Sequence, residues 1–224
     1  MKKYLIIAGL LITGLLIAGI SYAIWDHHVS TNFVPFEPAG LDPDRTYTRS
    51  YPLFNGFSEN LQLVLQDKGI NYQVGDYGEV SIPLKVADNK ALVTELTKKA
   101  YDISWVYAHT KNDNSFLCKG KDYTAIVFKD SINLTCDDVA LAEQLLGAGN
   151  TEYKLAKYYR QYFGYINEKG ERCVEIDLST IVNSDIRRLL KGRLLVEDGG
   201  TGFLHARINL SRHLFLDIVP GSNA

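Results

Sequence analysis

Apolar residues dominate an uncharged stretch from Tyr4 to Trp25. At ~1.5 Å per helical residue this stretch would span about 33 Å, close to the hydrocarbon thickness of a bilayer. A helix that is apolar on every face does not suit a soluble domain, so the pattern predicts one N-terminal transmembrane helix. Lys2 and Lys3 precede it, and the next Lys or Arg is Arg45. This asymmetry predicts that the N-terminus lies inside the cytoplasmic membrane and the rest of the chain outside.

The fate of the apolar stretch is left open by its C-terminal end. Small residues at Ser21 and Ala23 fit the positions that signal peptidase reads, so residues 1–23 could be a cleaved signal peptide. The stretch is longer than the ~7–15 apolar residues of a signal-peptide core, and Trp25 suits a membrane interface. Residues 1–25 are therefore predicted to be a retained anchor, with cleavage as the alternative. The lysine-rich start is typical of bacteria, where the outside is the periplasm in a Gram-negative cell.

Proline marks the region that follows the anchor. Four of the six prolines fall between residues 26 and 53, where few apolar positions recur. Proline disfavours helix at its own position and at the preceding one, so residues 26–50 are predicted to form an extended tether. Residues 51–224 are then an extracytoplasmic domain. A subdivision near residue 150 is an alternative, because two predicted helices there separate two groups of strands.

Helical and strand periodicities alternate along this domain. Apolar residues that recur every three or four positions predict helices at 58–68, 88–107, 138–146, 152–163 and 184–191. Short apolar or alternating runs predict strands at 70–74, 80–84, 116–119, 123–129, 132–136, 172–178, 194–197 and from 203 onward. Most of the predicted strands are joined by short turns into hairpins, and the two strands of a hairpin pair antiparallel. The predicted fold class is therefore α+β, with antiparallel hairpins interleaved with helices.

Composition and local motifs exclude several functions. The chain has 24 Lys and Arg against 26 Asp and Glu, so its near-neutral charge gives no electrostatic reason to expect a nucleic-acid partner. The five histidines and three cysteines form no local zinc template, so neither a metal nor a cofactor is predicted. The glycines at 147–149 and 199–202 lack the helix that follows a phosphate-binding loop, and they predict a helix end and a hairpin turn.

The cysteines give one open question. An oxidising compartment would allow a disulfide between Cys118 and Cys136. In a three-stranded meander, however, both would lie on outer strands, two spacings of ~4.8 Å apart, beyond the ~7 Å limit on Cα separation. The sequence leaves this bond undecided. Cys173 has acidic neighbours that disfavour a thiolate, so it is predicted to be an unactivated free thiol.

The outer faces of two C-terminal strands contain the only catalytic candidates. Alternation turns Glu175 and Asp177 outward on one strand and His205 outward on the other. If the strands are neighbours, two carboxylates ~7 Å apart would lie beside a histidine, a spacing open to acid–base pairs. The same alternation also describes an ordinary solvent face. These three residues are therefore weak catalytic candidates.

Tyrosine is the remaining unusual feature. Five of the 14 tyrosines cluster between residues 153 and 165, more than one buried stripe of a helix can use. Tyr153 and Tyr158 are predicted to be exposed and to bind a partner. The favoured hypothesis is a non-enzymatic, membrane-anchored domain that binds another protein of an envelope assembly. The alternatives are an exported hydrolase of glycan or cell-wall material, using the three candidates above, and an exported small-molecule or lipid-binding domain.

Overall fold

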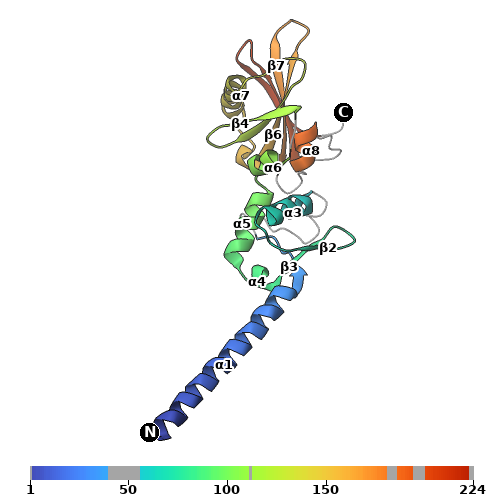
Figure 1. Ribbon diagram of the computed structural model, residues 1–224. Coiled ribbons are helices and arrows are strands. Elements are labelled where there is room, and N and C mark those ends of the chain that lie inside the picture. Colours follow the sequence, from blue (N-terminus) through green and yellow to red (C-terminus); the bar gives the residue numbers. More distant parts are fainter. Residues whose placement is uncertain (1, 40–55, 111–112, 181–185, 194–199, 222–224) are drawn as a thin grey trace.

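A computed structural model shows a long N-terminal helix, a small α+β layer and a larger sheet, in that order (Figure 1). It describes residues 2–39, 56–110, 113–180, 186–193 and 200–221, and side chains of the first helix from residue 15 on. The helices are α1 (Lys2–Thr31), α3 (Phe57–Asp67), α4 (Leu84–Ala87), α5 (Lys90–Ala100), α6 (Ile103–His109), α7 (Cys136–Gly149) and α8 (Ile186–Lys191), with a 3-10 turn η1 (Leu155–Lys157). The strands are β1 (Phe33–Pro35), β2 (Gln73–Val74), β3 (Val80–Pro83), β4 (Ser115–Lys119), β5 (Thr124–Phe128), β6 (Tyr158–Ile166), β7 (Arg172–Thr180), β8 (Gly200–Asn209) and β9 (Leu214–Gly221). The predicted α+β class is confirmed.

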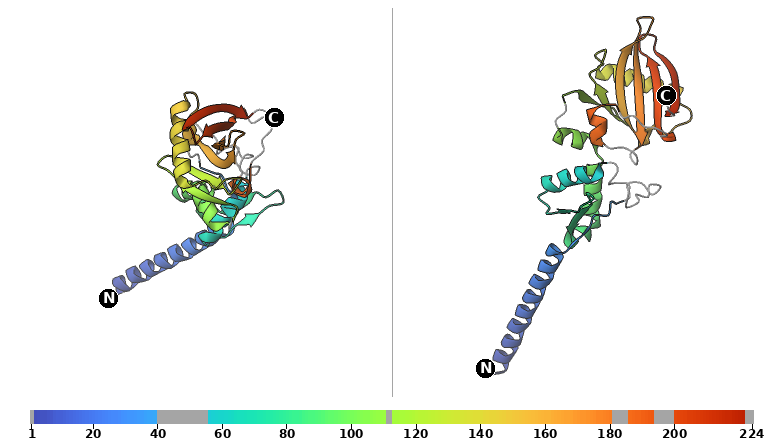
Figure 2. Two further views of the ribbon diagram at one scale, coloured as in Figure 1. Left: turned by 90° about the horizontal axis from the view of Figure 1, so that it is seen from above. Right: turned by 90° about the vertical axis from the view of Figure 1, so that its right-hand side faces the viewer.

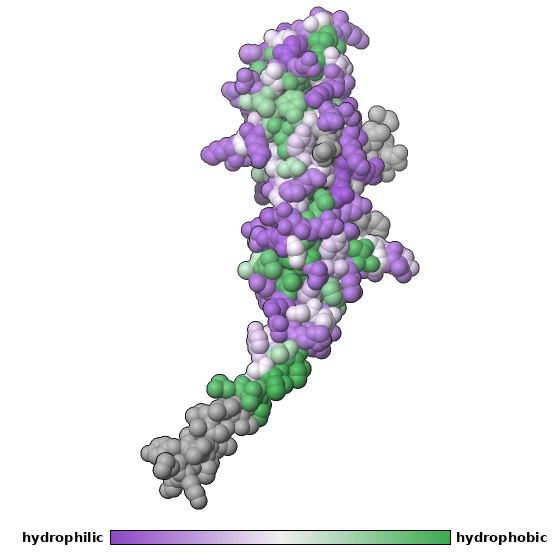
Figure 3. All heavy atoms as spheres, viewed as in Figure 1, coloured by the Kyte–Doolittle hydropathy of each residue, from purple (hydrophilic) through white to green (hydrophobic). Residues whose placement is uncertain are grey.

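Helix α1 exposes its apolar side chains from Leu15 to Trp25. Leu15, Ile20 and Trp25 are 73%, 58% and 55% exposed, and Figure 3 shows this apolar surface beside the polar body of the molecule. Across the residues that the structure describes, no helix has both the length and the hydropathy needed to cross a membrane.

The region after the apolar stretch differs from the predicted tether of residues 26–50. Residues 26–31 continue α1, and residues 33–35 form β1, which pairs antiparallel with β3. Phe36, the next residue, is buried in the core. Proline is tolerated here because Pro35 lies on an edge strand, where a missing N–H breaks no ladder. Residues 40–50 of the predicted tether lie outside the described residues, as does the predicted strand at 194–197.

The small layer consists of the sheet β1-β3-β2 and the helices packed on it. The predicted hairpin at 70–84 is observed, with Gln73 opposite Ser81. Helix α3 ends two residues before Gly69, whose φ of 64° is a left-handed conformation that favours glycine. The helix predicted over 88–107 is instead α5 and α6, because the Asp102 side chain accepts hydrogen bonds from the first backbone N–H groups of α6 and starts a new helix.

The large sheet has the order β4-β5-β6-β7-β8-β9 (Figure 2). All its neighbours are antiparallel except β5 and β6, which are parallel because α7 crosses over between them. The strand predicted at 132–136 is not found. Thr135 caps α7 through a reciprocal pair of hydrogen bonds with Asp138, so the chain turns into a helix at that point.

The predicted tyrosine-rich helix at 152–163 is wrong, because residues 158–166 form strand β6. Every residue from Tyr158 to Gly164 is buried, since helices cover both faces of the sheet at this strand. Tyr158 is 4% exposed, and its hydroxyl donates to the Thr201 carbonyl. The predicted exposure of Tyr158 is therefore also wrong. Tyr153 precedes the strand and is half-buried, packed against the core beneath α7.

Two hydrophobic cores lie on opposite faces of the large sheet. The first joins Ile126, Tyr159 and Phe163 of the sheet to α3, α5, α6 and α8, and so continues into the small layer. The second packs α7 on the other face, and Figure 1 shows α7 and α8 on opposite sides of the sheet. The predicted subdivision near residue 150 falls within this second core. The change from the small layer to the large sheet comes earlier, between α6 and β4.

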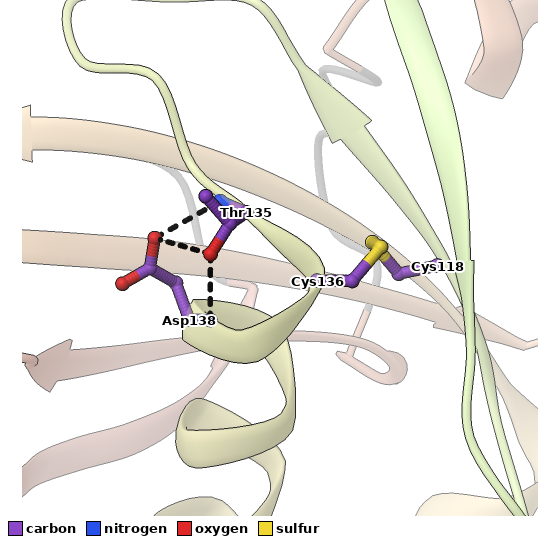
Figure 4. The surroundings of a disulfide bond; sticks show 4 residues. All are labelled: Cys118, Thr135, Cys136 and Asp138. Atoms are coloured by element: carbon purple, nitrogen blue, oxygen red, sulfur yellow. Dashed lines mark hydrogen bonds between the residues drawn. A yellow bond between two sulfur atoms is a disulfide. The ribbon is translucent and has the colours of Figure 1, made fainter.

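The structure joins Cys118 and Cys136 in a disulfide (Figure 4). The geometric objection disappears because Cys136 is the first residue of α7 and not the end of a third strand, and the Cα atoms are 5.4 Å apart. The bond fastens the start of α7 to the edge strand β4. Cys173 is free and buried, and burial raises the pKa of its thiol.

Asp138 makes the attachment of α7 dependent on pH. Burial alone would raise the pKa of its carboxyl, but hydrogen bonds from Arg172 and Thr135 outweigh burial and lower it. The resulting stabilisation is complete above the unfolded-state pKa, about 3.9, and is lost as the pH falls through the lower folded-state pKa. We expect Asp138→Asn to be less stable than the wild type at neutral pH in urea unfolding, with a difference that begins to shrink only below about pH 4 and vanishes once the pH is below the folded-state pKa of Asp138.

Asp137 provides the matched control for this prediction. It lies in the same first turn of α7 but is exposed, so it experiences the helix dipole without the two partners of Asp138. Asp137→Asn should show a smaller loss at neutral pH. A constant difference between wild type and Asp138→Asn across the acid range would contradict the assignment.

Candidate functional site

The three catalytic candidates predicted from the sequence do meet. Strands β7 and β8 are neighbours, and their register places Asp177 directly opposite His205. The His205 Nδ1 atom lies 2.7 Å from Asp177 Oδ1, and its Nε2 atom lies 3.9 Å from Glu175 Oε1. An acidic pair thus lies beside a histidine on one face of the large sheet.

Arg193 is the fourth member of this group, and sequence reasoning missed it. Its Nε and Nη2 atoms donate to Asp177 at 2.7 and 3.1 Å, while Nη1 lies 2.8 Å from Glu175 Oε2. The guanidinium also stacks 4.8 Å from the ring centroid of Phe163. No local pattern connects an arginine after a helix to a strand 16 residues earlier. We call Glu175, Asp177, Arg193 and His205 the Asp177 clamp.

Gln161 determines where Arg193 emerges. This buried residue of β6 lies opposite Asp177, and its Nε2 atom donates to the carbonyls of Leu189 and Gly192 at 2.8 and 2.6 Å. These carbonyls belong to the C-terminal end of α8, which would otherwise lack partners. The sheet therefore holds the end of α8 directly above Asp177, and Arg193 follows one residue later.

The clamp is buried on one side and exposed on the other. The Asp177 side chain is only 2% exposed, whereas Glu175, His205 and Arg193 are 28%, 25% and 37% exposed. Burial would lower the pKa of the Arg193 guanidinium, but the hydrogen bonds that it donates to Asp177 and Glu175 raise it overall. A cation is therefore fixed over two carboxylates, which is the arrangement that a buried carboxylate needs for stability.

This geometry favours a structural role over acid–base catalysis. Both oxygens of Asp177 are engaged, Oδ1 by His205 and Arg193 and Oδ2 by Arg193. A carboxyl pair that cleaves a glycosidic bond has to face the substrate on both sides of that bond. Three cavities lined by described residues, with linings between residues 101 and 160, 34 and 93, and 33 and 73, include no residue of the clamp.

A second buried polar group lies on the opposite face of the sheet. Arg160 of β6 has its Nε atom 2.7 Å from Glu143 Oε1 of α7, and Tyr162 donates to the same carboxylate. Burial, and then the Glu143 charge, raise the pKa of the Tyr162 hydroxyl well above its usual value. The Nε–H group of Arg160 makes no hydrogen bond with the described residues, so its contact with Glu143 Oε1 is an ion pair only. These residues attach α7 to the sheet.

No group of three or more His, Cys, Asp or Glu side chains is arranged to hold a metal ion in the part of the chain that the structure describes. Comparisons with family models, with curated proteins and with solved structures found no match to this chain.

Removing Arg193 tests the clamp. Arg193→Ala leaves the buried Asp177 carboxylate with His205 alone, so we expect the free energy of unfolding to fall by about 2–4 kcal/mol. The matched control is Arg207→Ala, which breaks a more exposed pair with Asp217 on the same face (Nε to Oδ1, 3.0 Å) and should cost less than about 1 kcal/mol. Both are measured by urea unfolding, and equal losses would show that the clamp contributes nothing special.

Proposed function

We propose that this protein is a membrane-anchored, extracytoplasmic accessory domain of a bacterial envelope assembly, which acts by binding another protein and not by catalysis. The observation that carries the location is the Cys118–Cys136 disulfide. Structural disulfides form and persist in oxidising compartments such as the periplasm. This agrees with the apolar stretch at residues 4–25 and with the lysines before it, which orient the rest of the chain outward.

The join between α1 and the small layer supports an anchored arrangement. Asp26 of α1 forms an ion pair with Lys85 of α4 at 2.7 Å, and the Leu84 N–H donates to the Asn32 carbonyl at 2.8 Å. Val29, on the same side of α1, is buried. If residues 4–25 lie in the bilayer, the small layer adjoins the membrane surface and the large sheet is farther out (Figure 1). Helix α1 would then hold the domain in a fixed position relative to the membrane.

Strand β9 is the surface best suited to a protein partner. It is the last strand of the large sheet and pairs only with β8 among the described strands. Its Leu214, Leu216 and Val219 side chains are 46%, 44% and 47% exposed. An edge strand with unpaired backbone groups and apolar side chains accepts a further strand from a partner. We therefore propose that β9 binds an extended segment of another envelope protein.

The hydrolase alternative has less support. It requires Glu175, Asp177 and His205 to face a substrate, whereas Asp177 is enclosed in the clamp. The sheet edge at β9, in contrast, has exposed apolar side chains with no partner among the described residues apart from β8. Binding is therefore the function that the geometry supports better.

The location is tested through the disulfide itself. In full-length protein alkylated inside intact cells before lysis, we expect Cys118 and Cys136 to resist a thiol reagent unless a reductant is added, because the bond forms outside the cytoplasm. An added protease should digest the domain in spheroplasts. Free thiols at both positions together with protection from the protease would overturn the proposed location.

The partner surface is tested by charging the edge. Leu216→Lys with Val219→Lys should abolish crosslinking between a photoreactive residue at position 214 and its envelope partner, because lysine on an edge strand opposes strand addition. Ile166→Lys is the matched control, since Ile166 is 48% exposed at the end of β6. Crosslinking should survive in the control, and neither variant should shift the unfolding temperature by more than a few degrees. A partner retained by the charged edge would exclude β9.

A further inference from the structure

A charge-free groove of about 580 Å³ lies on the small layer. It runs between Phe33 of β1 and the segment that leads from the end of α3 into β2. Its size falls within the ~300–1,000 Å³ that is usual for small-ligand sites. Neither the Asp177 clamp nor the β9 edge contributes to it, so it is a separate feature of the molecule.

The groove is built around the left-handed turn at Gly69. The chain leaves α3 there, and the Ile70 N–H donates back to the Leu65 carbonyl at 2.9 Å. Ile70 and Tyr72 then pack against the first hydrophobic core, which fixes the course of the segment. Asn71 and Gln73 alternate with them and are exposed. The lining is therefore held by the fold and not by a free loop.

The chemistry of the lining is uniform. None of its residues has a formal charge, although 22% of the chain is Asp, Glu, Lys or Arg. Three carboxamides line it, from Gln66, Asn71 and Gln73, together with the half-buried rings of Phe33 and Tyr72. Gln66 Nε2 donates to the Tyr72 hydroxyl at 2.6 Å. Within the described part of the chain, the carboxamides of Asn71 and Gln73 make no hydrogen bond.

This combination identifies a ligand class. A phosphate or carboxylate would call for a cationic group, and a metal ion for carboxylate or imidazole ligands, but the groove has neither. A carboxamide donates and accepts at once, as the hydroxyl groups around a sugar ring require. Aromatic rings offer an apolar surface to the C–H face of such a ring. An uncharged sugar satisfies both kinds of group together.

We propose that this groove binds an uncharged saccharide segment. The proposal rests on the proposed function only in that an extracytoplasmic location would give the groove access to envelope glycan. Binding in the groove requires no catalysis and no partner protein. It would let the domain hold glycan beside the membrane while β9 engages a protein.

Binding is measured by calorimetry on the purified full-length protein in detergent, with chitotriose and maltotriose as probes. We expect at least one of them to bind with a dissociation constant in the millimolar range or tighter. The double variant Asn71→Ala with Gln73→Ala should weaken binding at least tenfold. Its unfolding temperature should stay within a few degrees of the wild type, because both side chains are exposed.

Tyr77→Ala is the matched control, since Tyr77 is 88% exposed in the turn of the same hairpin and does not line the groove. It should bind as the wild type does. Absence of binding by both sugars, or wild-type affinity in the double variant, would overturn the groove assignment. Because the measurement needs no membrane and no partner, such a failure leaves the location and the β9 edge untouched, and their failure leaves this result standing.

Discussion

Strand β6 has to bury two faces at once, because α7 covers one face of the large sheet while α6 and α8 cover the other. Its two polar residues in the interior therefore need partners. Arg160 meets Glu143 of α7, and Gln161 donates to the last carbonyls of α8. Helices α7 and α8 are thus each fixed to the sheet by one polar residue of the same strand. An unpartnered charge or amide at either position would destabilise the centre of the fold.

The Asp177 clamp extends this arrangement by one strand. Asp177 of β7 lies opposite Gln161, which holds the end of α8. Arg193, which follows α8, therefore lies over the buried Asp177 carboxylate. Glu175 and His205 then complete the group toward solvent. These four residues resemble an acid–base site, but their arrangement is explained by the need to pair the buried Asp177 carboxylate where α8 ends on the sheet. The same residue types occur in catalytic sites and in buried ion pairs. The structural role is indicated here because both oxygens of Asp177 already accept hydrogen bonds.

Local pattern predicted the parts of the fold whose partners are near in sequence. The hairpin at 70–84, the end of the helix just before Gly69 and the shared face of Glu175 and His205 all follow from short-range geometry. Asp177, which alternation also turned outward, is instead buried. The sequence could not reveal that β6 is covered on both sides, and a strand buried on both faces has no alternation, so its tyrosines mimicked a helical stripe. Arg193 was missed for a related reason, since its partners are set by the packing of α8. The prolines led to the wrong prediction of a tether at β1, because an edge strand tolerates a residue that cannot donate a ladder hydrogen bond.

The continuity of the first core has a consequence for the whole molecule. It includes Val80 and Ile82 of the small sheet, Ile103 of α6 and Tyr159 of β6, so the two layers share one buried region. Helix α1 is joined to the small layer by the Asp26–Lys85 ion pair and by Val29. A helix held in a bilayer would therefore set the direction of the small sheet, and the shared core would pass that direction on to the large sheet. The groove beside Gly69 and the edge strand β9 would then keep fixed heights above the membrane, so that a glycan and a protein segment could be bound at the same time without rearrangement of the domain.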